Sequence, residues 1–150
     1  MAARGITTLL CLLEPAEAAS LGLADEAALC AAAGIAYLSH PIPDMQLPEP
    51  DAFAALIFGL AARIEQGTHL AVHCRASIGR SGMVGCCLLG TQGMDADSAI
   101  RAVSAARGLA VPDTAEQADF IARMIARLQA QSGRRNLGPG GSIASNPMAR

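Results

Sequence analysis

The residues with the clearest chemical meaning are the ten consecutive residues 73–82, whose sequence is HCRASIGRSG. The apolar pattern predicts a strand that ends at His73 and a helix from about Arg80, with a loop between them. Backbone N–H groups in such a loop can point inward, and the N-terminus of the helix adds partial positive charge. The segment therefore predicts an anion cradle that has the thiol of Cys74 at its base.

The side chains around Cys74 are of the types that would activate a thiol towards a phosphate ester. A thiol that faces amides, a helix N-terminus and a guanidinium loses its proton near neutral pH. Arg80 follows six positions later, and its planar fork suits two oxygens of a phosphate. Ser81 is close enough to hydrogen-bond the sulfur, and we expect His73 to brace backbone carbonyls. The expected phosphate-binding residues are Arg75, Ala76, Ser77, Ile78, Gly79 and Arg80.

A candidate general acid precedes this loop in the chain. Asp44 lies 30 residues before Cys74, in a loop over residues 40–50 that contains four prolines. Transfer of a phosphoryl group to a thiolate expels an oxygen that needs a proton, and a carboxylic acid on a movable loop can supply it. Loops at strand ends of an α/β sheet meet at one edge, which favours this role. On the residues alone, a solvated loop carboxylate is the commoner explanation.

Strands that alternate with helices must position these residues. This order predicts a single α/β domain with a central, mostly parallel sheet flanked by helices. The Gly- and Pro-rich residues 133–150 predict a flexible tail after a catalytic domain at 1–132. Thr114 with Gln117 has capping-box spacing, so we expect Gln117 to cap a helix. The expected strands are 6–13, 35–38 and 69–73, and the expected helices are 17–33, 51–67, 80–89, 95–107 and one from 114.

Composition excludes several classes of protein. The chain has 150 residues, 52% of them hydrophobic and 16% charged, which fits one domain with a real core. A net charge of −2 argues against a broad nucleic-acid surface, and no apolar run approaches the ~18–20 residues of a membrane span.

Residues 4–18 loosely resemble a signal peptide, but Glu14 and Pro15 favour a buried strand there. Five cysteines without a CxxC pair predict reduced thiols and a cytoplasmic protein, and their spacing argues against a disulfide framework or a four-thiolate zinc site.

Residues 73–82 resemble the signature of the cysteine-dependent protein tyrosine phosphatase superfamily, His-Cys-x5-Arg-Ser/Thr. Within it the chain is similar to the dual-specificity branch, especially bacterial relatives of the cyclin-dependent-kinase-associated phosphatase, over residues 5–130. Residues 41–44 look like the general-acid loop of that group, and residues 111–117 look like its final turn.

The resemblance implies hydrolysis of phosphate monoesters through a phosphocysteine, without metal or other cofactor. It implies that Cys74 is the nucleophile, that Asp44 is acid and then base, and that Arg80 stabilises the transition state. His73 and Ser81 would support the loop. The implied partner is a phosphorylated protein or peptide, or a small phosphate ester, and neither nucleic acid nor membrane.

Two departures from the family pattern leave alternatives open. Ser77 stands where the family usually has glycine, and a Cβ there would crowd the cradle. Family members also carry a further strand or two before the position of Gly5, so the sheet is expected to have an open edge. One alternative is a catalytically weak phosphoprotein-binding module. Another is a phosphatase of lipid or small-molecule phosphates, although Arg75 adds the only charge between Cys74 and Arg80.

Overall fold

A three-stranded parallel sheet lies at the centre of the computed structural model, which describes residues 4–136. The strands are β1 (Thr8–Cys11), β2 (Ala36–Ser39) and β3 (Leu70–His73), in the order β2-β1-β3. All four residues of β1 are buried, as expected for the middle strand of a sheet covered on both faces. The α/β class and the parallel sheet predicted from the sequence are confirmed, although the first strand is shorter than 6–13.

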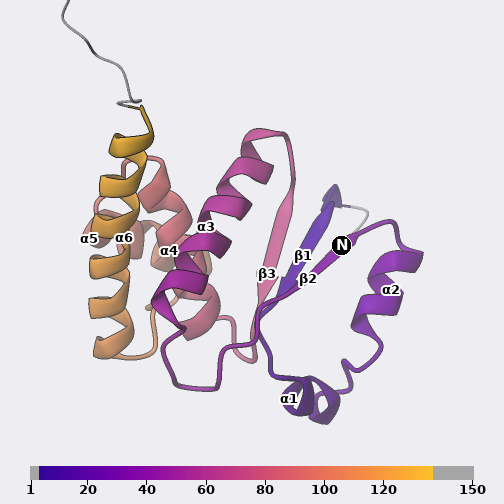
Figure 1. The fold of residues 1–150 in the computed structure, drawn as a ribbon. Helices are drawn as coiled ribbons and strands as arrows, with labels where there is room; N and C mark the ends of the chain where they lie inside the picture. Colours follow the sequence, from indigo (N-terminus) through magenta and orange to yellow (C-terminus); the bar gives the residue numbers. More distant parts are fainter. Residues whose placement is uncertain (1–3, 137–150) are drawn as a thin grey trace, which may run out of the picture.

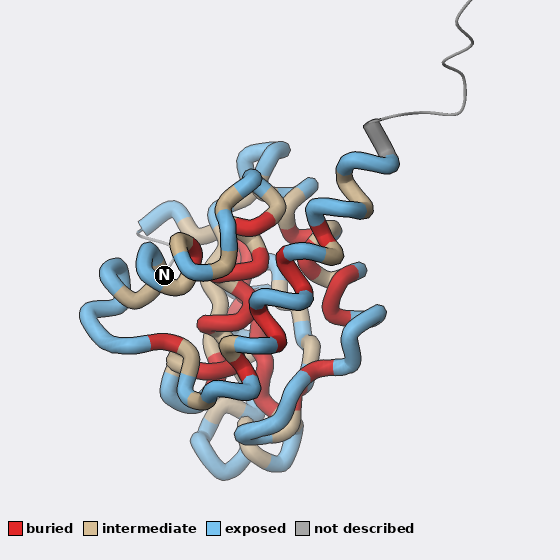
Figure 2. Tube along the Cα trace, turned by 90° about the vertical axis from the view of Figure 1, so that its left-hand side faces the viewer, coloured by how far each residue is buried: buried red, intermediate tan, exposed pale blue. Residues whose placement is uncertain are grey.

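Helices cover both faces of this sheet (Figure 1). The larger group, α3 to α6, lies on one side, and α1 and α2 lie on the other. Buried stretches gather in the centre between these layers, and exposed stretches form the outside (Figure 2). The helices are α1 (Pro15–Ser20), α2 (Glu26–Ala32), α3 (Pro50–Glu65), α4 (Gly79–Thr91), α5 (Ala96–Arg107) and α6 (Ala115–Asn136).

The single helix predicted over 17–33 is wrong, because the chain turns between α1 and α2. Gly22 has a φ of 72°, a left-handed conformation that costs glycine little. The N–H of Leu23 donates to the carbonyl of Ala18, which closes the end of α1 in a helix-terminating turn. The break leaves α1 at the carboxyl end of β1, where its first turn can reach the anion loop.

Capping residues define the ends of the other helices. Asp95 accepts a hydrogen bond from the N–H of Ser98, and Gly108 ends α5 with a φ of 70°, so the helix agrees with the range predicted over 95–107. At α3 the capping residue is Glu49, whose carboxylate accepts from two backbone N–H groups, at 2.9 and 2.6 Å. Helix α3 therefore begins at Pro50, one residue before the start predicted at 51, because proline suits the first helical position.

The main core lies between the sheet and α3, α4 and α6. Helices α4 and α6 approach closely at Gly90, where an added Cβ would lie 2.5 Å from Cγ1 of Ile125. A smaller cluster on the other face joins Leu9 to Cys30 and Ile35. Helix α6 extends to Asn136, so four residues of the predicted tail are helical, and the rest lie outside the described residues. No helix among the described residues is long and apolar enough to span a membrane.

Candidate active site

The anion loop leaves β3 at Cys74 and enters α4 at Gly79, as the sequence predicted. Cys74 is buried, and its sulfur lies 3.1 Å from the hydroxyl oxygen of Ser81. Burial by itself would raise the pKa of this thiol. Hydrogen bonds from the Ser81 side chain and from backbone N–H groups of Ser81 and Ser77, with the charge of Arg80, outweigh burial and lower it. These contacts therefore make the thiolate easier to form than that of an unperturbed cysteine.

Arg80 is 3% exposed and is held by groups from α1 and from the loop after β2. Its Nη1 and Nη2 donate to the two carboxylate oxygens of Glu17, at 2.7 and 2.8 Å. Nη1 also donates to the carbonyl of Ile42 at 3.0 Å. This bidentate pair lowers the pKa of Glu17 and raises that of Arg80. The guanidinium is thus fixed in one orientation at the start of α4.

Glu17 is the residue that sequence reasoning missed. It lies in the first turn of α1, 63 residues before Arg80, and its side chain is 11% exposed. Its sequence neighbourhood looks like an ordinary Ala-rich helix. The available signal was the need of a buried arginine for a carboxylate partner. That need does not say which of the 13 acidic residues supplies it.

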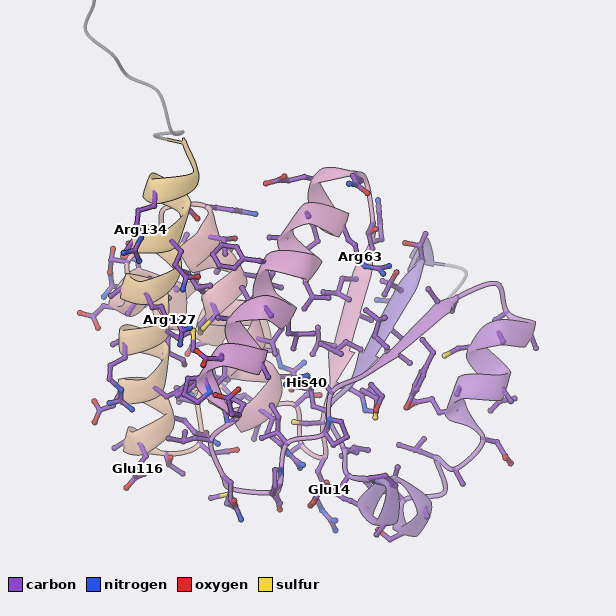
Figure 3. All side chains as sticks on the ribbon, viewed as in Figure 1. Glu14, His40, Arg63, Glu116, Arg127 and Arg134 are labelled. Atoms are coloured by element: carbon purple, nitrogen blue, oxygen red, sulfur yellow. The ribbon has the colours of Figure 1, made fainter. Side chains whose placement is uncertain are left out.

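Asp44 reaches the same guanidinium from the loop after β2. Its Oδ1 lies 2.9 Å from Nη2 of Arg80, and its side chain is 57% exposed. In Figure 3 the labelled His40 and Glu14 lie near the lower end of the sheet, from which this loop and α1 leave. The carboxyl ends of the strands thus gather the loops at one edge, as the sequence predicted. The structure therefore brings Cys74, Arg80 and Asp44 together.

These groups line one pocket of about 180 Å³. The catalytic pocket, as we call it, is lined by Asp44, Met45, Cys74, Arg75, Ala76, Arg80, Asp113 and Gln117. Asp113 lies just before α6 and Gln117 lies in its first turn, and the N–H of Asp113 donates to the Gln117 side chain at 3.1 Å. Gln117 also closes the predicted cap, since its N–H donates to the hydroxyl of Thr114. Thr114 is thus the capping side chain, and Gln117 supplies the capped N–H and also lines the pocket.

Two features of the loop depend on backbone geometry. Ser77 has a φ of 55°, in the left-handed region that favours glycine. This explains why glycine suits the position and shows that the serine carries backbone strain. At Gly79 an added Cβ would lie 2.4 Å from Oδ2 of Asp113 and 2.7 Å from Oε1 of Gln117. A side chain here would require the ends of the Asp113 and Gln117 side chains to move away from the start of α4.

His73 lies outside the catalytic pocket. The hydrogen bond that the structure records for it joins its Nε2 to Oε2 of Glu26 at 3.0 Å, instead of the backbone carbonyl that we expected. Glu26 belongs to α2, so the contact ties the end of β3 to the helix on the far face of the sheet.

The arrangement can hold a phosphate between the loop amides and Arg80, with the sulfur of Cys74 beneath it. The carboxylate of Asp44 lies at the rim of the pocket, on the side where the leaving oxygen of the ester would depart. These are the parts that a thiolate attack on a phosphate ester needs.

Comparisons with known proteins agree with this geometry. The family model described as "Tc-R-P: Polymorphic toxin system, DSP-PTPase phosphatase" matches residues 1–94. The structure of Tk-PTP in its active form is 27% identical, with a TM-score of 0.69 over 84% of this chain and 82% of that one. A search of curated proteins finds no match.

Two more distant structures share the fold. Kinase associated phosphatase, with its catalytic cysteine replaced by serine, is 22% identical with a TM-score of 0.78, over 85% of this chain and 73% of that one. PTPMT1 in complex with PI(5)P is 16% identical with a TM-score of 0.72, over 87% and 83% of the two chains. Since the family model covers more than half of the chain, this protein belongs to the DSP-PTPase family of the dual-specificity cysteine phosphatase superfamily.

Proposed function

We propose that this protein hydrolyses phosphate monoesters on proteins through a phosphocysteine intermediate. The observation that carries the proposal is the convergence of the Cys74 sulfur, the Arg80 guanidinium and the Asp44 carboxylate on one small pocket. The Cys74 thiolate attacks phosphorus, and the bond to the leaving oxygen breaks while Asp44 protonates that oxygen. Asp44 then takes a proton from water, which attacks phosphorus, releases phosphate and restores the thiolate.

The contact between Asp44 and Arg80 bears on how the substrate would enter. Asp44 occupies one of the guanidinium nitrogens, Nη2, that a phosphate would bind. A bound phosphate must therefore displace the carboxylate from Arg80, which moves Asp44 outward towards the leaving oxygen. The large exposure of Asp44 permits this movement, and the Glu17 pair holds Arg80 in place meanwhile.

The charge around the pocket supports a protein substrate. Among the residues that the structure describes, the cationic side chains that line it are Arg75 and Arg80, and the acidic ones are Asp44 and Asp113. The extra phosphates of a multiply phosphorylated lipid headgroup would lie against the Asp44 and Asp113 carboxylates and be repelled by them. A phosphorylated protein side chain carries a single phosphate, which the anion loop can hold. The similarity to PTPMT1 shows the fold and does not favour lipid substrates here.

The mechanism is tested by removing the acid and varying the leaving group. Asp44→Asn should lower kcat by roughly 10²- to 10⁴-fold on phosphotyrosine peptides, the usual range for acid catalysis. It should cost much less on an aryl phosphate with an acidic phenol, which leaves without a proton. Asp113→Asn is the matched control, because Asp113 lines the same pocket, and should show no such dependence. Equal losses on all leaving groups would refute the acid role of Asp44.

The nucleophile and the substrate class need separate measurements. Cys74→Ser should retain vanadate binding and lose turnover, and more than about a hundredth of wild-type activity would refute the phosphocysteine route. Turnover should not change with EDTA. A panel of phosphopeptides and phosphoinositides should show higher kcat/KM for peptides by at least about tenfold. A preference for phosphoinositides would make it a lipid phosphatase, and the absence of turnover on every substrate would make it a binding module.

A further inference from the structure

A second cluster of reactive side chains lies behind the anion loop, on the sheet face that α2 covers. Cys11 of β1 and His73 of β3 are direct partners in the parallel register, so their side chains project to the same face. Glu26 reaches this face from α2 and contacts Nε2 of His73 at 3.0 Å. The sulfur, the imidazole nitrogen and the carboxylate oxygen all lie within 4.8 Å of one another.

The donor set has the chemistry of a zinc site. Thiolate, imidazole and carboxylate are the three ligand types that Zn²⁺ takes in proteins, and three protein ligands with one open position are a common arrangement. Bond lengths of about 2.0–2.3 Å place tetrahedral ligand atoms roughly 3–4 Å apart. The atoms of this cluster need to move by only a few tenths of an ångström to about one ångström to reach that spacing.

The burial of these three side chains and their access from solvent both favour cation binding. Cys11 is 1% exposed, and the Glu26 and His73 side chains are 12% and 20% exposed, so a bound cation would be largely shielded from water. Tyr37 and Cys30 lie beside this cluster, and Tyr37 shares a side-chain hydrogen bond with Cys11. Glu26 also lines an open apolar pocket of about 410 Å³ beside α2, which gives a cation a route to the site.

We propose that Cys11, Glu26 and His73 form a binding site for Zn²⁺ or a similar borderline-soft divalent cation. Binding replaces the thiol proton of Cys11 and the proton that His73 shares with Glu26, so the cation gains thiolate, imidazole and carboxylate ligands while these protons pass to solvent or to the other ring nitrogen. A water completes the four ligands. None of the three residues lines the catalytic pocket, so the cation takes no part in phosphoryl transfer.

The site joins two neighbouring strands of the sheet to the helix on their outer face. Cys11 ends β1, His73 ends β3, and Glu26 begins α2. His73 immediately precedes Cys74. A cation here would cross-link these elements behind the anion loop, so we expect it to raise the melting temperature of the folded chain by binding only the native state.

The test uses the full chain with Cys74→Ser, which removes the catalytic thiolate as a competing ligand. Dialysis against Zn²⁺ should leave one zinc per chain. Co²⁺ should give a near-ultraviolet thiolate-to-cobalt absorption band. Adding Cys11→Ser should abolish that band and weaken zinc binding by at least tenfold, and adding Glu26→Gln should weaken binding while keeping the band. Cys30→Ser is the matched control, because Cys30 lies on α2 outside the ligand set, and it should leave both readouts unchanged.

Circular dichroism of each variant tests for the native fold. Because Cys11 is buried, Glu26→Gln at the more accessible side keeps the test valid if Cys11→Ser fails to fold. The proposal is overturned if the Cys74→Ser chain retains no zinc on dialysis. It is overturned equally if the cobalt spectrum lacks a thiolate band, or if zinc binding is unchanged in Glu26→Gln.

Discussion

The pair between Glu17 and Arg80 gives the sharpest prediction about this protein. Glu17→Gln replaces the carboxylate with a neutral amide of nearly the same shape. One oxygen can still accept from Arg80, but the other position becomes an NH₂ group that faces a guanidinium donor. The change therefore leaves a 3%-exposed cation without its bidentate partner.

The size of the effect follows from the burial of the pair. Removing one partner of a buried ion pair costs about 3–5 kcal/mol. The lower end applies, because Asp44 and the carbonyl of Ile42 still contact Arg80. A loss of about 3 kcal/mol lowers the melting temperature of a chain of this size by roughly 6–12 °C. A guanidinium displaced by about 1 Å would lower kcat/KM by ~10²-fold.

Thermal unfolding and kcat/KM on an aryl phosphate measure the two effects, and Glu14→Gln is the control. Glu14 precedes the same helix, and its side chain makes no capping hydrogen bond there. Removing its charge should leave both quantities near wild type. If Glu17→Gln and Glu14→Gln behave alike, Glu17 does not hold Arg80 and the reasoning is refuted.

The same pair predicts a dependence on pH with a definite sign. Arg80 holds the pKa of Glu17 below its ordinary value of about 4.3. A carboxyl group whose pKa is lowered in the folded state stabilises that state above its unfolded pKa, and this stability is lost as the pH falls through the lowered value. The difference in melting temperature between wild type and Glu17→Gln should be full at pH 7 and should shrink as the pH falls below about 4.

Three further predictions concern the loop and the helix behind it. Ser77→Gly should raise stability by about 0.5–1 kcal/mol and keep or raise kcat/KM, because it relieves a left-handed serine, whereas Ser77→Ala should give no gain. Gly90→Ala should cost about 1–3 kcal/mol in denaturant unfolding, since its Cβ would meet Ile125, whereas Gly59→Ala on α3 has open space and should stabilise slightly. Ser81→Ala should move the acidic limb of the kcat/KM profile to higher pH, because it removes the hydrogen bond that lowers the pKa of Cys74; an unmoved limb would contradict that role.

The anion loop could be predicted from the sequence because all of its residues are neighbours along the chain. Residues 73–82 are contiguous, and the strand before them and the helix after them fix which way their N–H groups point. The same holds for Asp95 and Gly108 at the ends of α5, where each residue acts on backbone groups within one turn. Such features depend on the spacing of residues along the chain, which can be read directly from the sequence.

Tertiary structure alone decided the contacts that cross the sheet. Glu17 meets Arg80 across 63 residues, and Glu26 meets His73 across 47. Cys11 faces His73 only because β1 pairs with β3 in one register, and a shift of one residue would turn the side chain to the other face. The turn at Gly22, which propensity did not predict, places α1 and α2 where both glutamates can reach these partners. Pairings of this kind depend on how the sheet and helices pack, because many carboxylates in the chain are equally suited to each partner by type.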